Sequence, residues 1–93
     1  MDSTIARSLL NAELECLRVN PYSFFAQSVN KTTHKEILGP DGFTYQMELE
    51  VFWDNCKAGN IRVQGSVDDG KWRALKPLTE SFIIAPDGTF LDE

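Results

Sequence analysis

The chain has few of the residues on which metal and catalytic sites are built. Its 93 residues include one histidine and two cysteines. Structural zinc sites use about four clustered cysteine and histidine ligands, whereas Cys16 and Cys56 lie far apart and no Cys-x-x-Cys pair is present. We therefore expect neither a metal ion nor a cofactor.

Nucleophile–base pairs are equally scarce. Any Ser-His-Asp or Cys-His arrangement would have to use His34, which we interpret as a solvated histidine at a loop exit. Phosphate-binding glycine loops and the H-E-x-x-H pattern are absent. Asp68-Asp69-Gly70 is typical of a hairpin tip rather than of a metal site. These absences favour a protein that is not an enzyme.

Basic residues and long apolar runs are also in short supply. Nine Lys and Arg stand against fourteen Asp and Glu, which gives an acidic chain of net charge −5. Nucleic acids and anionic membranes both require clustered cations, so neither partner is expected. No run approaches the ~18 apolar residues of a membrane span, and Met1 to Thr4 does not resemble a signal peptide. We expect a cytoplasmic protein with free thiols.

The most regular pattern runs from Tyr45 to Asp54. Apolar side chains alternate with polar ones along it, which is typical of a half-buried β-strand. We predict that it is the central strand of a small antiparallel sheet within a single domain, residues 1–93. The face predicted to be buried carries Tyr45, Met47, Leu49, Val51 and Trp53.

Two helices are predicted ahead of the sheet. Residues 3–18 carry an apolar stripe at helical spacing, in which Cys16 is expected to be a small buried hydrophobe. Asn20-Pro21 is typical of a helix start, so a second helix is predicted over residues 21–29, with Asn20 as its N-cap. The two rows of the stripe are Ile5, Leu9, Ala12 and Cys16, and Leu10, Leu14 and Leu17.

Turn residues separate the predicted strands. After a short strand at 34–38, Gly39 to Gly42 is predicted to form a three-residue hairpin loop with a glycine bulge. Ala85 to Gly88 repeats the same Pro-Asp-Gly chemistry and should connect the arms of a C-terminal hairpin.

The register after the third strand is predicted from Asp69-Gly70, the preferred pair for a two-residue turn. Such a turn would place Trp72 opposite Val67 in the core and Ala74 opposite Gly65. Gly65 would then leave a low spot in the buried face, where a helix or a large side chain could approach closely.

Together these elements predict an α+β fold of two N-terminal helices packed on one face of an antiparallel four-stranded meander, with a C-terminal hairpin. The order of helix and meander resembles the cystatin-like arrangement, as a fold-level analogy only. Asn20-Pro21-Tyr22, Asp68 to Ala74 and Ala85 to Phe90 are also similar to a family of short uncharacterised bacterial proteins. That resemblance implies a bacterial cytoplasmic protein and supplies no catalytic residues.

We interpret the chain as a small soluble domain that acts through protein–protein contact or as an accessory module. Phe52 and Leu75 are apolar exceptions on the polar face of the sheet and are candidates for such a contact. The alternative is a small-molecule binder or an enzyme with a pocket between the helices and the sheet. The aromatic residues predicted to line that pocket are Tyr22, Phe25, Trp53 and Trp72.

The terminal segment from Phe82 to Leu91 is too apolar to stand in water, so it must pack on its own sheet or on a partner's. We favour its own sheet, and therefore a monomer over a homodimer. Lys35 and Glu36 are predicted to protect the edge of the first strand, because charged side chains discourage unwanted strand pairing.

Overall fold

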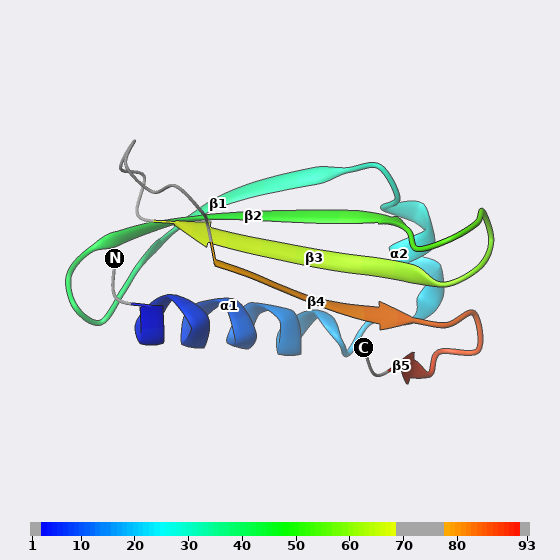
Figure 1. Cartoon of the computed structure of the whole chain (residues 1–93), viewed down its shortest axis with the longest axis horizontal. Helices are drawn as coiled ribbons and strands as arrows, with labels where there is room; N and C mark the ends of the chain where they lie inside the picture. The colour runs from blue at the N-terminus through cyan, green and yellow to red at the C-terminus, as the bar shows by residue number, and fades with distance from the viewer. Residues whose placement is uncertain (1–2, 69–77, 92–93) are drawn as a thin grey trace.

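The chain folds into one antiparallel sheet with its helices on a single face (Figure 1). The computed structural model describes residues 3–68 and 78–91. The elements are α1 (Ser3–Leu17), α2 (Tyr22–Gln27), β1 (Thr32–Leu38), β2 (Thr44–Trp53), β3 (Ile61–Asp68), β4 (Leu78–Ile84) and β5 (Phe90–Leu91). The five strands lie side by side in chain order. The predicted α+β class is confirmed, with one five-stranded sheet in place of four strands and a separate hairpin.

The alternation along β2 places its apolar side chains as predicted. Tyr45, Met47 and Leu49 are buried on the helix side, which we call the inner face. Val51 and Trp53 continue that row and are half-buried, packed against the same core. Polar side chains of β2 lie on the outer face, which no helix covers in the described part of the chain.

α1 packs against the inner face through a seam of residues four apart. Ala6, Leu10 and Leu14 are buried, and α1 contacts β3 and β4. The prediction that Cys16 is buried is wrong: Cys16 is exposed, as is Ala12 of the same predicted row. A helix turns about 100° per residue, so Cys16 lies about 200° around the axis from Leu14 and faces away from the sheet.

Gly65 determines how closely α1 approaches. A Cβ atom at this position would lie 2.5 Å from Leu10 Cδ1 and 3.6 Å from Leu14 Cδ2. The predicted low spot in the inner face is therefore confirmed, and the helix occupies it. Arg7 also forms an ion pair with Glu80, which ties the start of α1 to β4.

The predicted register between the third and fourth strands is wrong. β3 pairs with β4 so that Val67 faces Leu78 and Gly65 faces Glu80, rather than Trp72 and Ala74. The observed register places Phe82 opposite Val63 inside the core. Burying so large an apolar side chain stabilises the fold by about 1.5–3 kcal/mol. Trp72 and the predicted turn lie outside the described residues.

The two Pro-Asp-Gly turns have the same hydrogen bonding, as predicted. Gly39 N–H donates to Phe43 O over 2.8 Å in the first turn, and Ala85 N–H donates to Thr89 O over 2.8 Å in the second. Gly42 and Gly88 both have φ near +85°, at 84° and 89°, in the region that favours glycine.

α2 closes one end of the core with an aromatic cluster. The Phe25 ring meets the Phe82 ring edge-on, and Phe82 meets Phe90 in the same way. The guanidinium of Arg18 lies 5.0 Å from the Phe82 ring and 4.8 Å from the Phe90 ring. The terminal hairpin thus packs on its own sheet, which was the expected alternative. Asn20 does not cap α2, since its side-chain amide donates to Leu17 O at the end of α1.

Candidate interaction surface

β1 is an edge strand and the most exposed strand of the sheet. Only Ile37 among its seven residues is half-buried, and the others are exposed. One side of β1 pairs with β2 over its whole length. Within residues 3–68 and 78–91, no strand pairs with its other side. A strand in this position presents unpaired backbone groups that another strand can use.

Two hydrogen bonds fix which backbone groups of β1 are used. Gly39 N–H donates to Phe43 O, and Val51 N–H donates to Lys31 O over 3.4 Å. Both lie on the same ladder as β1 and β2, so the odd-numbered residues of β1 bond to β2. The even-numbered residues direct their N–H and C=O groups away from the sheet. We call these groups of Thr32, His34, Glu36 and Leu38 the open edge.

The side chains of β1 alternate in the same way. His34 and Glu36 lie on the outer face, opposite Glu48 and Gln46 of β2. Lys35 lies on the inner face, and its ammonium donates to Glu13 Oε1 of α1 over 2.8 Å. The positive charge that faces inward next to the open edge is therefore paired within the chain.

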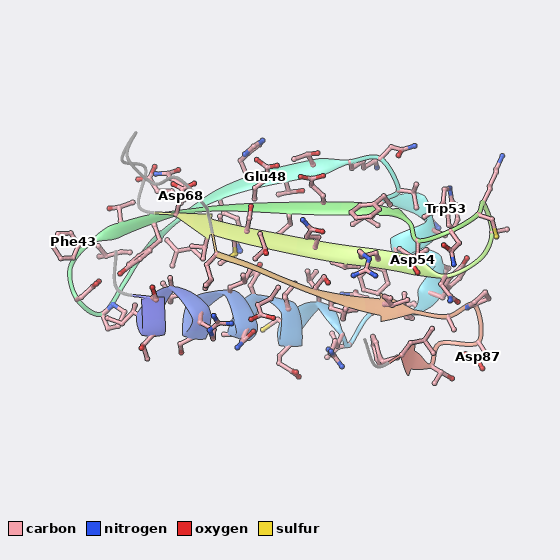
Figure 2. The ribbon with its side chains drawn as sticks, in the orientation of Figure 1. Phe43, Glu48, Trp53, Asp54, Asp68 and Asp87 are labelled. Carbon is pink, nitrogen blue, oxygen red and sulfur yellow. The ribbon has the colours of Figure 1, made fainter. Side chains whose placement is uncertain are left out.

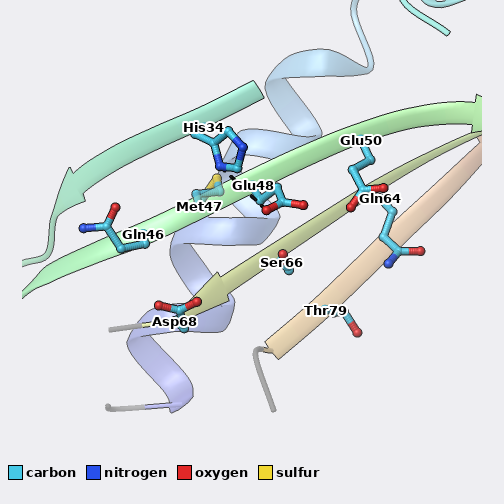
Figure 3. Close-up of a pocket in the computed structure, with 9 residues that line it drawn as sticks. All are labelled: His34, Gln46, Met47, Glu48, Glu50, Gln64, Ser66, Asp68 and Thr79. Atoms are coloured by element: carbon cyan, nitrogen blue, oxygen red, sulfur yellow. Dashed lines mark ion pairs between the residues drawn. The ribbon is translucent and has the colours of Figure 1, made fainter. Parts of the chain in front are cut away.

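An open pocket of about 400 Å³ lies on the outer face beside β1 (Figure 3). Its carboxylates come from β2 and β3, and His34 borders it from β1. His34 Nδ1 lies 3.6 Å from Glu48 Oε2. The lining residues are His34, Gln46, Met47, Glu48, Glu50, Gln64, Ser66, Asp68 and Thr79.

Glu48 and Glu50 interact across this pocket. A side-chain hydrogen bond shared with Glu48 raises the pKa of Glu50, and desolvation and the Glu48 charge act in the same direction. His34 opposes the shift. In the described part of the chain, no group of three or more His, Cys, Asp or Glu side chains is arranged to hold a metal ion.

A second, apolar cavity lies between α2 and the inner face, where the aromatic pocket was predicted. Its volume is about 110 Å³. Phe25, one of the residues predicted to line the pocket, lines this cavity together with Phe24, Thr33 and Leu49. Tyr22 is half-buried and donates its hydroxyl to Gly59 O over 2.7 Å. Trp53 packs against the core. Of the described residues predicted to line the pocket, Phe25 lines this cavity, whereas Tyr22 bonds to Gly59 and Trp53 packs against the core. Trp72 lies outside the described residues.

Phe52 lies on the outer face as expected from the alternation. It is half-buried, stands opposite Arg62 of β3 and borders a shallow depression with Asn30 and Thr32. Leu75, its predicted companion, lies outside the described residues.

Sequence reasoning missed two exposed apolar side chains at the first turn. Leu38 is 71% exposed and Phe43 is 62% exposed. Figure 2 shows Phe43 at the far end of the molecule, beyond the sheet. The signal was present in the predicted hairpin: its register puts Leu38 opposite Thr44, on the polar face of the sheet.

No helix among the described residues is long and apolar enough to span a membrane. Comparison of the chain with protein-family models, with curated proteins and with solved structures finds no match.

Proposed function

We propose that the chain is a protein-interaction module that binds an extended segment of a partner as a sixth strand, paired with the open edge. The proposal rests on which residues of β1 bond to β2: within residues 3–68 and 78–91, the N–H and C=O groups of four alternate β1 residues have no strand partner. Peptide recognition by strand addition uses such groups for affinity and alternate side chains for specificity.

The chemistry on the two faces of β1 defines the segment that would fit. On the outer face, the Glu36 carboxylate favours a cationic or hydrogen-donating side chain opposite it. On the inner face, Thr33 borders the apolar cavity under α2, which favours an apolar side chain opposite Thr33. In an antiparallel partner strand, these two positions are three residues apart, with the donor first.

The small-molecule alternative has weaker support. Ligand pockets typically measure about 300–1,000 Å³ and enclose most of the ligand. The apolar cavity is smaller, at about 110 Å³, and the larger outer-face pocket is lined mainly by polar side chains. Action as an accessory module, a bacterial source and a cytoplasmic location remain predictions.

Proline substitution tests the proposal, because proline has no N–H to donate. In Glu36→Pro the lost N–H belongs to the open edge, so the ladder with β2 is kept. Glu36→Ala is the matched control, since it removes the same side chain and keeps the N–H. We expect cross-linking in extracts of the producing cells to trap partners on the wild type and on Glu36→Ala, and to lose them with Glu36→Pro.

The trapped complex should also show slow hydrogen exchange at the His34 and Glu36 amides. Partners that bind Glu36→Pro as strongly as the wild type would contradict the proposal and would move the interaction to another surface. A small molecule that co-purifies with the chain and leaves these amides unprotected would favour the alternative.

A further inference from the structure

We infer that a second copy of this chain fits the open edge, so that two β1 strands pair antiparallel about Lys35 and join two sheets into one. The inference rests on the proposed function and names a partner for it. The observation behind it is that the side chains of two β1 strands complement each other when the strands pair along their whole length.

The register follows from the length and phase of β1. Lys35 is the midpoint of Thr32–Leu38, so a two-fold axis through Lys35 pairs every residue of one strand with a residue of the other. His34 then faces Glu36 of the second copy, and Thr32 faces its Leu38. All four residues contribute open-edge groups, so each facing pair can exchange two backbone hydrogen bonds. No backbone donor of either strand is left over.

The side chains of the outer face favour this register over its neighbours. With the two-fold axis through Lys35, the imidazole of each His34 stands opposite the carboxylate of Glu36 of the other copy. With the two-fold axis through Glu36, the two Glu36 carboxylates would face each other. With the axis through His34, the two imidazoles would face each other. Opposite-charge and donor–acceptor pairs across strands are favourable, whereas like charges directly opposite are destabilising.

The self-complementarity also matches the inner-face chemistry. With the two-fold axis through Lys35, Ile37 of the second copy faces Thr33, which borders the apolar cavity. The segment His34-Lys35-Glu36-Ile37 thus provides a donor opposite Glu36 and, three residues later, an apolar side chain opposite Thr33. This is the pattern that the two faces of β1 favour in any partner strand.

The two Lys35 side chains face each other at the centre, and an inward-facing lysine is a common device against edge pairing. Here each ammonium is bound by Glu13 of its own chain over 2.8 Å. The facing groups are therefore two ion pairs rather than two isolated cations. The main contacts of α1 are with β3 and β4, and it reaches β1 through the Glu13–Lys35 ion pair.

The contact is small, since it involves a single strand from each copy. Stable interfaces usually bury more than about 1,000 Å², so we expect a weak dimer. The chain should be a monomer at low micromolar concentration, in line with the sequence-based expectation, and should associate as its concentration rises.

Sedimentation equilibrium of the purified chain, from about 5 to about 500 micromolar, tests the inference. We expect the average mass to rise from 10.5 kDa towards twice that value for the wild type. Glu36→Pro should remain at 10.5 kDa. Glu13→Gln, which leaves Lys35 without its counter-ion, should weaken association about tenfold, and the fold of each variant is checked by circular dichroism.

Disulfide trapping tests the register. In a chain whose exposed Cys16 and Cys56 are replaced by serine, Lys35→Cys should form a disulfide-linked dimer under mild oxidation, because position 35 faces itself. Thr33→Cys is the matched control on the same face of β1. It should not cross-link to itself, because position 33 faces position 37.

A constant mass of 10.5 kDa up to the highest concentration would overturn the second-copy inference. It would leave the proposed function intact if Glu36→Pro still abolished capture of another protein. A dimer that persists in Glu36→Pro, or a Thr33→Cys chain that cross-links as fast as Lys35→Cys, would also overturn the inference.

Discussion

Gly65 is the residue on which the contact between helix and sheet depends most closely. In Gly65→Ala the new Cβ would lie 2.5 Å from Leu10 Cδ1 and 3.1 Å from Leu49 Cδ2, and both leucines are buried. Overpacking of this kind costs about 1–3 kcal/mol of unfolding free energy. We expect a loss of that size by urea denaturation.

Ser66→Ala is the control for Gly65→Ala, because Ser66 is the next residue of β3 and lies on the outer face. Its effect should stay within about 0.5 kcal/mol. Equal stability of Gly65→Ala and the wild type would show that α1 does not approach β3 as described.

Asp41 illustrates how a turn carboxylate stabilises the folded state. The buried Tyr45 donates its hydroxyl to Asp41 Oδ2 over 2.6 Å. This hydrogen bond, with help from the Phe43 N–H, lowers the pKa of Asp41 below its ordinary value. The ionised carboxylate therefore stabilises the fold above its ordinary pKa, and this contribution is lost as the pH falls through the lowered pKa.

Tyr45→Phe should return the pKa of Asp41 towards its ordinary value, as followed by NMR titration of the carboxyl group. Its stability should also depend less on pH in the acid range than that of the wild type. An unchanged Asp41 pKa in Tyr45→Phe would assign the shift to the backbone of the turn instead.

At the scale of the element, β1 should tolerate proline at alternate positions only. Lys35→Pro removes an N–H that bonds to β2, so we expect a loss of about 1–3 kcal/mol. Glu36→Pro removes an open-edge N–H, so the loss should be about 1 kcal/mol or less. Urea titration of both variants compares their unfolding free energies and so shows which residues of β1 bond to β2. The reverse order of stabilities would mean that β1 pairs with β2 through its even-numbered residues.

Sequence patterns predicted helices and strands well where a local pattern, such as alternation or a turn motif, places the same side chains in the core as the folded structure does. The alternation of Tyr45, Met47 and Leu49 located β2, and the Pro-Asp-Gly turns located two hairpins. The register of β4 could not be predicted in this way, because it depends on the burial of Phe82 and Ile84, which lie far along the chain from β3. The rotation of α1 depends on the fit of Leu10 onto Gly65, which is a contact between distant segments.

At the scale of the whole molecule, the sequence predicted a single sheet covered on one face, and it predicted that the terminal hairpin packs on that sheet. The open edge was only partly foreseen. Lys35 and Glu36 were expected to protect β1, whereas the structure pairs Lys35 with Glu13. Which N–H groups face outward follows from the hydrogen bonds at Gly39 and Val51 together. Those bonds depend on the folded hairpin, and no single segment reveals them.

The open edge also fits the charge of the molecule. A net charge of −5 on 93 residues disfavours indiscriminate association, since identical acidic chains repel at long range. Strand pairing at short range must overcome that repulsion through aligned backbone groups. Self-association should therefore strengthen with added salt, which screens the repulsion between copies.

Residue-resolved hydrogen exchange along β1 shows which of its amides are bonded to β2 and which belong to the open edge. In dilute solution, the Lys35 and Ile37 amides should exchange slowly and the His34 and Glu36 amides quickly. At high concentration, or in a captured complex, the His34 and Glu36 amides should become slow as well. Slow exchange at His34 and Glu36 in the dilute monomer, or fast exchange there in every complex, would mean that partners do not pair with the open edge.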